Sequence, residues 1–283
     1  KNQQKLLLLL LGGLSLSLSR NSRQYFRTLK AIGKGWNEIN QQALKNAIAD
    51  LYKSKFLEEI ENCINPDHHA QFTKLINHLC EIQDPYNKKY PFIDNITHGM
   101  EVARLCMRKD PKLSEHLLLA AIGHDWDRAC GEKRIKSTDY PNSKEGNKKY
   151  KEDHSINSAG LFCAELQEIF DEDTIKKVHH LILNHEIGGE GELGILDFAD
   201  GMVFFSPKTL DYYRNGRIYV DINGNELPPK ELEEERKKGF ATKVNFMFET
   251  FSKEDIQFLK NYLQQNRSEL NPIVRSELDD LLR

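Results

Sequence analysis

Six histidine and aspartate side chains in the middle of the chain have the chemistry of metal ligands. Imidazole and carboxylate groups suit Zn, Mn, Fe or Ni, whereas thiolates favour soft metals and iron–sulfur clusters. The adjacent pair His124-Asp125 lets one short piece of backbone offer both a nitrogen and an oxygen ligand. A carboxylate can also bridge two cations about 3.5–4 Å apart, an arrangement that clamps attacking and leaving oxygens. The full set is His98, His124, Asp125, His154, His185 and Asp200.

The stretches that carry these residues resemble a known family. Each stretch has helical hydrophobic periodicity. The sequences are NITHGMEVARLC around His98, LLLAAIGHDWDR around His124-Asp125, KEDHSINSAGLF around His154, VHHLILNHEIGG around His185 and ILDFADGMVFF around Asp200. Their order, over roughly residues 88–207, resembles the HD superfamily of metal-dependent phosphohydrolases. The resemblance implies an all-α protein, an HD-type helical bundle around a His/Asp metal site.

The resemblance also implies a ligand set and a reaction. His98, His124, Asp125 and Asp200 correspond to the ligands of a mononuclear site, and the two remaining histidines extend it to two metals bridged by Asp125. Because all six positions are occupied, we predict two divalent metal ions, with Mn, Fe, Co, Ni, Zn and Mg not distinguishable. The implied reaction is hydrolysis of a phosphomonoester or phosphodiester in a nucleotide or other small phosphorylated metabolite. The alternatives are a di-iron oxygenase of the HD fold and a non-catalytic ligand-sensing module.

Two charged residues follow the His-Asp pair and are candidates for supporting roles. Arg128 lies three residues after Asp125, so the two side chains can share a helix face. Arg128 could bind a phosphate bidentately, or it could form an ion pair with an aspartate that fixes the helix end. Asp127 is either the partner of a ligating imidazole or a capping acid. We predict Asp125 and Arg128 as catalytic residues, and Arg128 also as a substrate-binding residue.

The segment around the fourth histidine of the set offers two candidate ligands. His180 and His185 are five residues apart, so an ideal helix separates them by about 500° and they do not share one face. His185 fits the family context because Glu186 follows it, and His180 is the alternative ligand. Glu186 is predicted to act in catalysis, as a general base or as a hydrogen-bond acceptor. Asp197, three residues before Asp200, is predicted to orient a ligand.

The segment 131–153 is polar, basic and rich in turn-forming residues. A stretch of about 20 residues without structure inside a compact domain is usually functional or disordered. We therefore predict a mobile lid over the metals, with a solvated surface loop as the alternative. Lys133 and Lys136 are predicted to bind the substrate. The positive residues that could face an anionic substrate are Lys133, Arg134, Lys136, Lys144, Lys148 and Lys149.

The chain divides into three parts by composition. Residues 1–37 contain no acidic residue and enclose a Leu/Ser-rich tract, so they form a low-complexity extension, an export signal or an organelle transit peptide. The tract is too short for a stable membrane span, which needs about 20 apolar residues. The HD domain with its preceding packing helices is assigned to 38–207, and a helical extension to 208–283. The expected location is cytoplasmic, with export or organelle targeting as alternatives.

The net charge limits the kinds of binding partner, and the C-terminal extension contains a predicted β-hairpin. The 283 residues carry a net charge of −3 and have a pI near 6.4, which argues against binding of a nucleic-acid polymer. The expected partner is a small phosphorylated substrate, and a homo-oligomer is compatible with the sequence. In the extension, alternating Ile218, Val220 and Ile222 before Asn223-Gly224 predict a small β-hairpin. This extension could complete the substrate pocket or form an oligomer contact.

Overall fold

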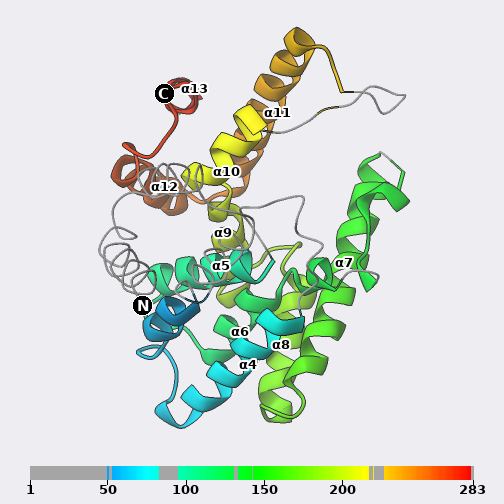
Figure 1. Ribbon diagram of the computed structural model, residues 1–283, viewed down its shortest axis with the longest axis vertical. Coiled ribbons are helices and arrows are strands. Elements are labelled where there is room, and N and C mark those ends of the chain that lie inside the picture. Colours follow the sequence, from blue (N-terminus) through cyan, green and yellow to red (C-terminus); the bar gives the residue numbers. More distant parts are fainter. Residues whose placement is uncertain are drawn as a thin grey trace, which may run out of the picture.

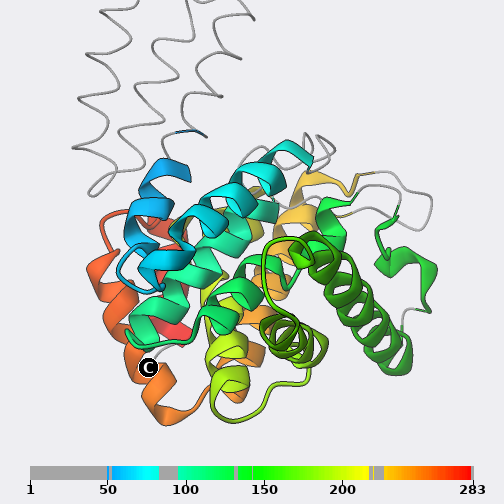
Figure 2. The ribbon, with the colours of Figure 1, turned by 90° about the horizontal axis from the view of Figure 1, so that it is seen from below.

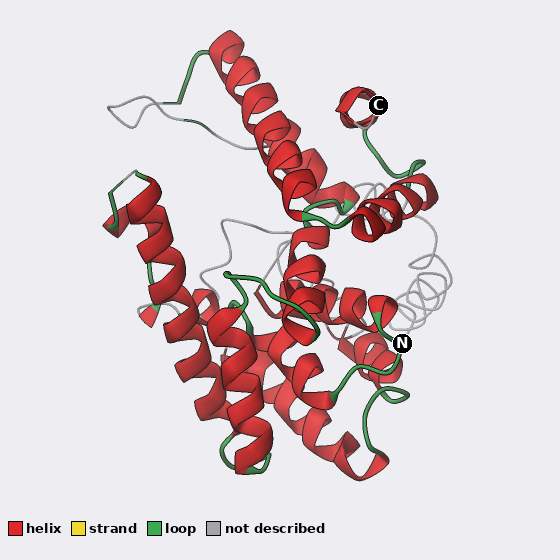
Figure 3. Ribbon diagram, turned by 180° about the vertical axis from the view of Figure 1, so that it is seen from behind, coloured by secondary structure: helices red, strands yellow, loops and turns green. Residues whose placement is uncertain are grey.

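The computed structural model describes residues 50, 53–82, 95–130, 133–141, 143–216, 219 and 226–281. Within these ranges every regular element is a helix, which confirms the predicted all-α class (Figure 3). The extension at 1–37 lies outside the described residues, and so do Ile218, Val220, Ile222 and Asn223-Gly224 of the predicted hairpin. None of the described helices combines the length and apolar composition needed to cross a bilayer.

A central helix, α6 (Glu115–Gly123), organises the first bundle. Its residues from Leu117 to Gly123 are all buried, as expected of a helix that is apolar on every side. Ser114 caps it by accepting a hydrogen bond from the Leu117 amide. The helices α5, α7, α8 and α9 pack against α6 (Figures 1 and 2). The elements of this bundle are η1 (Pro66–His68), α4 (His69–Ile82), α5 (Asn95–Lys109), η3 (Trp126–Ala129), η5 (Ser137–Asp139), α7 (Lys144–Leu166), α8 (Glu172–Asn184) and α9 (Glu192–Val203).

The C-terminal helices pack against one end of this bundle. They are α10 (Pro207–Asp211), a π-helical turn η6 (Tyr212–Gly216), α11 (Pro229–Thr250), α12 (Lys253–Gln265) and α13 (Pro272–Leu281). Ser252 and Asp255 form a capping box at the start of α12. An ion pair between Lys109 and Asp255 joins α5 to α12. Gly201 of α9 packs closely against α11. A Cβ at this position would lie 2.3 Å from the Met247 methyl group, so only glycine leaves room for it.

The prediction of a structureless lid over 131–153 is wrong for its second half. From Lys144 onward the chain is the first part of α7, and Ser143 caps it by accepting from the Gly146 amide. Lys148 forms an ion pair with Glu152, and Lys149 forms one with Asp153, in each case four residues further along the helix. Such pairs and a serine cap stabilise a helix without an apolar face. Lys144, Lys148 and Lys149 therefore lie on a regular helix and not on a loop.

Candidate metal centre

The six predicted ligands come from five helices and converge in the middle of the first bundle. His98 lies in the first turn of α5, and His154 lies inside α7. His124 and Asp125 follow the last residue of α6, and His185 follows the last residue of α8. Asp200 lies on α9. The structure thus brings together residues that are far apart in the chain.

Three of these side chains and one oxygen of Asp125 form a first cluster. Nε2 of His98 lies 3.2 Å from Nε2 of His124 and 3.1 Å from Oδ1 of Asp200. Nε2 of His124 lies 3.4 Å from the same Asp200 oxygen. Oδ2 of Asp125 lies 3.5 Å from Nε2 of His98. Ligand atoms bound about 2.1 Å from one tetrahedral ion lie about 3.4 Å apart, so this spacing fits a single cation.

The other oxygen of Asp125 belongs to a second cluster. Oδ1 lies 2.8 Å from Nε2 of His154. His185 completes the cluster, since Asp125, His154 and His185 each offer a ligand atom within 4.8 Å of the others. The His185 ring lies edge-on to His124 on one side and to His154 on the other. Asp125 is therefore the member shared by two adjacent groups of metal-capable atoms.

Backbone carbonyls fix the orientation of two of the imidazoles. Nδ1 of His124 donates to Ala121 O at 2.9 Å, and Nδ1 of His185 donates to Ile182 O at 2.6 Å. Because a carbonyl can only accept, Nδ1 of each ring carries a proton, and Nε2 is the nitrogen that faces the cluster. Nε2 of His185 is buried and has no hydrogen-bond partner among the described residues. Such a group costs about 1–3 kcal/mol, and a bound cation would remove that cost. The donor set therefore fits divalent cations.

The carboxylates of the site are held in the ionised form. Burial alone would raise the pKa of Asp125, but the charges of Arg128 and His124 lower it well below its usual range. Burial is likewise outweighed at Asp200, where hydrogen bonds from His124 and His98 lower the pKa. Both ligands are thus negatively charged at neutral pH, as a cation site requires.

The imidazoles divide into two electrostatic types. Burial opposes protonation of His98, but Asp125 and Asp200 outweigh it and raise its pKa to about 9. Burial is similarly outweighed at His154, mainly by Asp125, and its pKa also rises to about 9. At His185 burial and the neighbouring His124 lower the pKa to about 4, so this ring is neutral.

Arg128 and Asp127 contact the ligands directly. Nη1 of Arg128 forms an ion pair with Oδ2 of Asp125, the second of the two roles predicted for this arginine, and 32% of its side chain is exposed. Oδ1 of Asp127 lies 2.7 Å from Nδ1 of His154, and both side chains are fully buried. Asp127 also accepts hydrogen bonds from Ser158 Oγ and from the Ile135 amide. Asp127 therefore orients the His154 ring, and Asp127 is in turn fixed by two donors.

The other predicted residues lie outside the two clusters. Glu186 forms an ion pair with Lys151, Nζ to Oε2 being 2.6 Å. Lys133 and Lys136 are exposed, and the backbone carbonyl of Lys133 accepts a hydrogen bond from Asn157. Asp197 lies on α9, where partial burial of its carboxyl group and the charges of Asp200 and Glu186 raise its pKa to about 6.

His180, the alternative to His185, is not part of the centre. It is exposed, and its ring and its carbonyl are bonded to Asn184 on the outer face of α8. His185 is buried and faces the other ligands. The five-residue spacing between the two histidines places only one of them toward the bundle axis, which is the reason for this choice.

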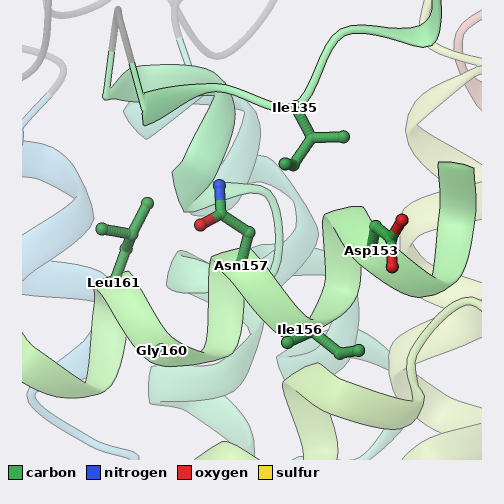
Figure 4. A pocket seen from close by; sticks show the side chains of 6 residues that line it. All are labelled: Ile135, Asp153, Ile156, Asn157, Gly160 and Leu161. Carbon is green, nitrogen blue, oxygen red and sulfur yellow. The ribbon is translucent and has the colours of Figure 1, made fainter. Parts of the chain in front are cut away.

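A hollow of about 490 Å³ lies on the face of α7 opposite its buried side (Figure 4). Ile135 forms its far wall. None of the six metal-capable residues lines it. The hollow is therefore separate from the candidate metal centre. Its lining consists of Ile135, Asp153, Ile156, Asn157, Gly160 and Leu161.

Sequence reasoning missed two lysines near the centre. Lys151 lies three residues before His154, so helical spacing could have pointed to it. Lys243 lies on α11, and no local pattern in the sequence connects it with Asp200. The charges of Asp200 and Lys151 both act on Lys243, and the charge of Lys151 acts on Asp197.

Comparison of the chain with protein-family models, with curated proteins and with solved structures finds no match. What the protein does is therefore inferred from its own side chains.

Proposed function

We propose that this protein is a metal-dependent phosphohydrolase with an HD-type dinuclear centre. Its substrate would be a phosphomonoester or phosphodiester in a nucleotide or another small phosphorylated metabolite. The observation that supports this most is the position of Asp125. Its two oxygens face two groups of histidine nitrogens, which is the arrangement of a carboxylate that bridges two cations.

The residues that would hold the cations follow from the two clusters. His98, His124, Asp200 and Oδ2 of Asp125 would bind one cation, and His154, His185 and Oδ1 of the same aspartate the other. When bound, such cations lower the pKa of water, polarise a phosphoryl oxygen and neutralise developing negative charge. The donors do not separate Mn, Fe, Co, Ni, Zn and Mg.

The protein's own groups would orient the ligands and the substrate. Asp127 holds the His154 ring, and the carbonyls of Ala121 and Ile182 hold two others. Arg128 uses one N–H group on Asp125, and its partly exposed guanidinium has further donors for a phosphoryl oxygen. Arg128 would therefore serve as both ion-pair partner and anion ligand. Glu186 remains the proposed proton acceptor, with Lys151 holding its carboxylate in place.

The test combines metal analysis with a phosphate-release screen. Purified protein should hold about two metal ions per chain, and nucleotides and sugar phosphates should be screened with Mn²⁺, Co²⁺, Ni²⁺, Fe²⁺ and Mg²⁺. Asp125→Ala should lose metal and activity while keeping its helical content. Asp173→Ala, a change of an exposed aspartate on α8, is the matched control and should lose neither.

Three other outcomes would overturn the proposal. Full metal occupancy in Asp125→Ala would remove the assigned ligand set. Two irons per chain with oxygen consumption and no phosphate release would establish the di-iron oxygenase instead. A protein that retains no metal and turns over no phosphate ester would be better explained as a ligand-sensing module.

A further inference from the structure

Three basic side chains outside the two ligand clusters, Arg128, Lys151 and Lys243, have contacts that bear on the centre. Lys151 lies on the same face of α7 as His154, one turn earlier, and its ammonium is bonded to Glu186 at 2.6 Å. Arg128 lies next to Asp125 and pairs with the carboxylate oxygen that His154 does not contact. Lys243 lies on α11, a helix of the C-terminal extension.

The position of Lys243 follows from the packing of α11 on α9. Met247, one turn along α11, lies against Gly201, the residue next to Asp200. The Lys243 ammonium lies 5.8 Å from the centre of the Phe204 ring, and Phe204 follows Asp200 by one helical turn. The two helices thus place this ammonium near the end of α9 that carries Asp200.

The charges that act on the Lys243 ammonium include that of Asp200, a candidate ligand. Burial lowers the pKa of its ammonium, the charge of Asp200 raises it, and Lys151, Glu186 and Arg128 all act on it as well. Its pKa still lies below the usual value, so burial is not fully compensated. Within the described part of the chain, its direct partners are the rings of Phe204 and Phe246, and no carboxylate lies within ion-pair distance.

A half-buried lysine with only aromatic partners reduces stability. Buried charges are normally paired, and the contact with a ring face recovers only about 0.5–2 kcal/mol. An ammonium that lacks a counter-ion next to a cation site is therefore suited to an anion supplied from outside. Lys151 differs, since Glu186 already neutralises it.

We infer that the Lys243 ammonium, together with the guanidinium of Arg128, forms an anion-binding site that holds a phosphate group of the substrate next to the metal centre. The inference rests on the proposed function for its substrate class. It also assigns a role to the C-terminal extension: α11 completes the substrate pocket. Lys243 touches substrate on this assignment and is a binding residue, not a ligand of the cations.

Binding of inorganic phosphate, measured by isothermal titration calorimetry on the full chain, tests the inference. Lys243→Met should weaken phosphate binding about tenfold or more, since it removes one charge-assisted hydrogen bond. Metal content, measured separately on each preparation, should stay at the wild-type value. Lys238→Met removes an exposed charge from the same helix and should leave phosphate affinity unchanged. Lys243→Arg, which keeps the charge, should recover part of the affinity.

The melting temperature separates a binding role of Lys243 from a structural one, because loss of a structural residue would lower it. Because Lys243 lacks a carboxylate partner among the described residues, Lys243→Met should melt at the same temperature as the wild type or higher. An unchanged phosphate affinity in Lys243→Met, an equal loss in Lys238→Met, or a wild type that binds no phosphate would each overturn the inference. Loss of metal from the wild type would instead contradict the proposed function, and metal analysis separates the two failures.

Discussion

Nδ1 of His154 lies 2.7 Å from Oδ1 of Asp127, and neither side chain is exposed to solvent. The pair turns the other nitrogen of the ring toward Oδ1 of Asp125. A carboxylate this close to the imidazole holds the ring by charge and raises its basicity, which strengthens the ring as a metal ligand. The buried Asp127 thus acts on the centre through His154.

Asp127→Asn should therefore weaken metal binding without unfolding the bundle. An amide keeps the shape of the side chain but loses the negative charge, and loss of such a partner typically costs 10–100-fold in metal affinity, about 1.4–2.7 kcal/mol. Competition with a fluorescent chelator would measure the affinity. Asp173→Asn, at an exposed site on α8, is the control. Equal affinities in the two variants would show that Asp127 only caps the turn η3.

Stabilisation by metal should depend on pH. In the protein without metal, the pKa values of His98 and His154 are raised to about 9 by their carboxylate partners, against an ordinary value of 6.5. Groups with raised pKa values stabilise the fold below the ordinary value, and this contribution is lost as pH rises through the raised one. The metal-free protein should therefore lose stability between pH 6.5 and pH 9.

Stabilisation by bound metal should increase with pH, because cations and protons compete for the same nitrogen atoms. The difference in melting temperature between the metal-loaded and chelator-treated protein should grow over that pH interval. Scanning fluorimetry at several pH values measures it, with Asp125→Ala as the variant that should show no difference. A difference that is constant or shrinks with pH would contradict the assignment of the two histidines as ligands.

Much of the architecture around the centre is predictable because it depends on local patterns. The uninterrupted apolar run from Leu117 to Ile122 predicts a central helix, and α6 is buried along that whole run. The capping residues Ser252 and Asp255 predict the start of α12. The identities of the six converging residues were expected from the resemblance of their sequence contexts to the HD superfamily, and not from helix geometry.

Other features depend on contacts that no local pattern encodes. The beginning of α7 is polar, and its ion pairs and the Ser143 cap stabilise it, so hydrophobic periodicity does not reveal it. The pairing of Glu186 with Lys151 joins the end of α8 to α7, and nothing in the sequence near Glu186 indicates this partner. Lys243 approaches Asp200 only because α11 folds back over α9. These are contacts between residues far apart in the chain, and local sequence patterns do not predict them.

Gly99 should be required for the close packing of α5 on α6 beside the ligands. A Cβ at this position would lie 2.1 Å from the carbonyl oxygen of Ile122, a backbone atom that cannot rotate away. Gly99→Ala should cost about 1–3 kcal/mol in the free energy of unfolding, as overpacking typically does. It should also reduce metal affinity, because the adjacent His98 moves relative to His124. Urea unfolding and chelator competition measure the two effects.

Gly160→Ala is the matched control for this prediction. Gly160 lies within α7, and a Cβ there would meet no atom within 4 Å. Alanine should stabilise that helix by about 0.5–1 kcal/mol and leave metal affinity unchanged. If Gly99→Ala behaved like Gly160→Ala, the distance between α5 and α6 would have no influence on the centre.

Arg214 should hold the C-terminal helices in the position that Lys243 requires. Its side chain is only 1% exposed, and its guanidinium bonds Glu233 of α11 at 2.6 Å and Glu277 of α13 at 2.7 Å. Breaking a fully buried ion pair costs about 3–5 kcal/mol in the free energy of unfolding. Because both carboxylates here are partly exposed, we expect Arg214→Met to cost less, about 1–3 kcal/mol. Urea unfolding measures the cost, and limited proteolysis should show earlier cleavage within 229–281.

The matched control is Arg267→Met, which removes an exposed pair with Asp279 and should shift stability only slightly. If α11 completes the anion site, Arg214→Met should also weaken phosphate binding while metal content stays constant. The loss should be smaller than in Lys243→Met, because the ammonium remains and only its placement becomes less fixed. Phosphate affinity that is unaffected in a destabilised Arg214→Met would mean that α11 keeps its position on α9 through Met247 and Gly201 alone.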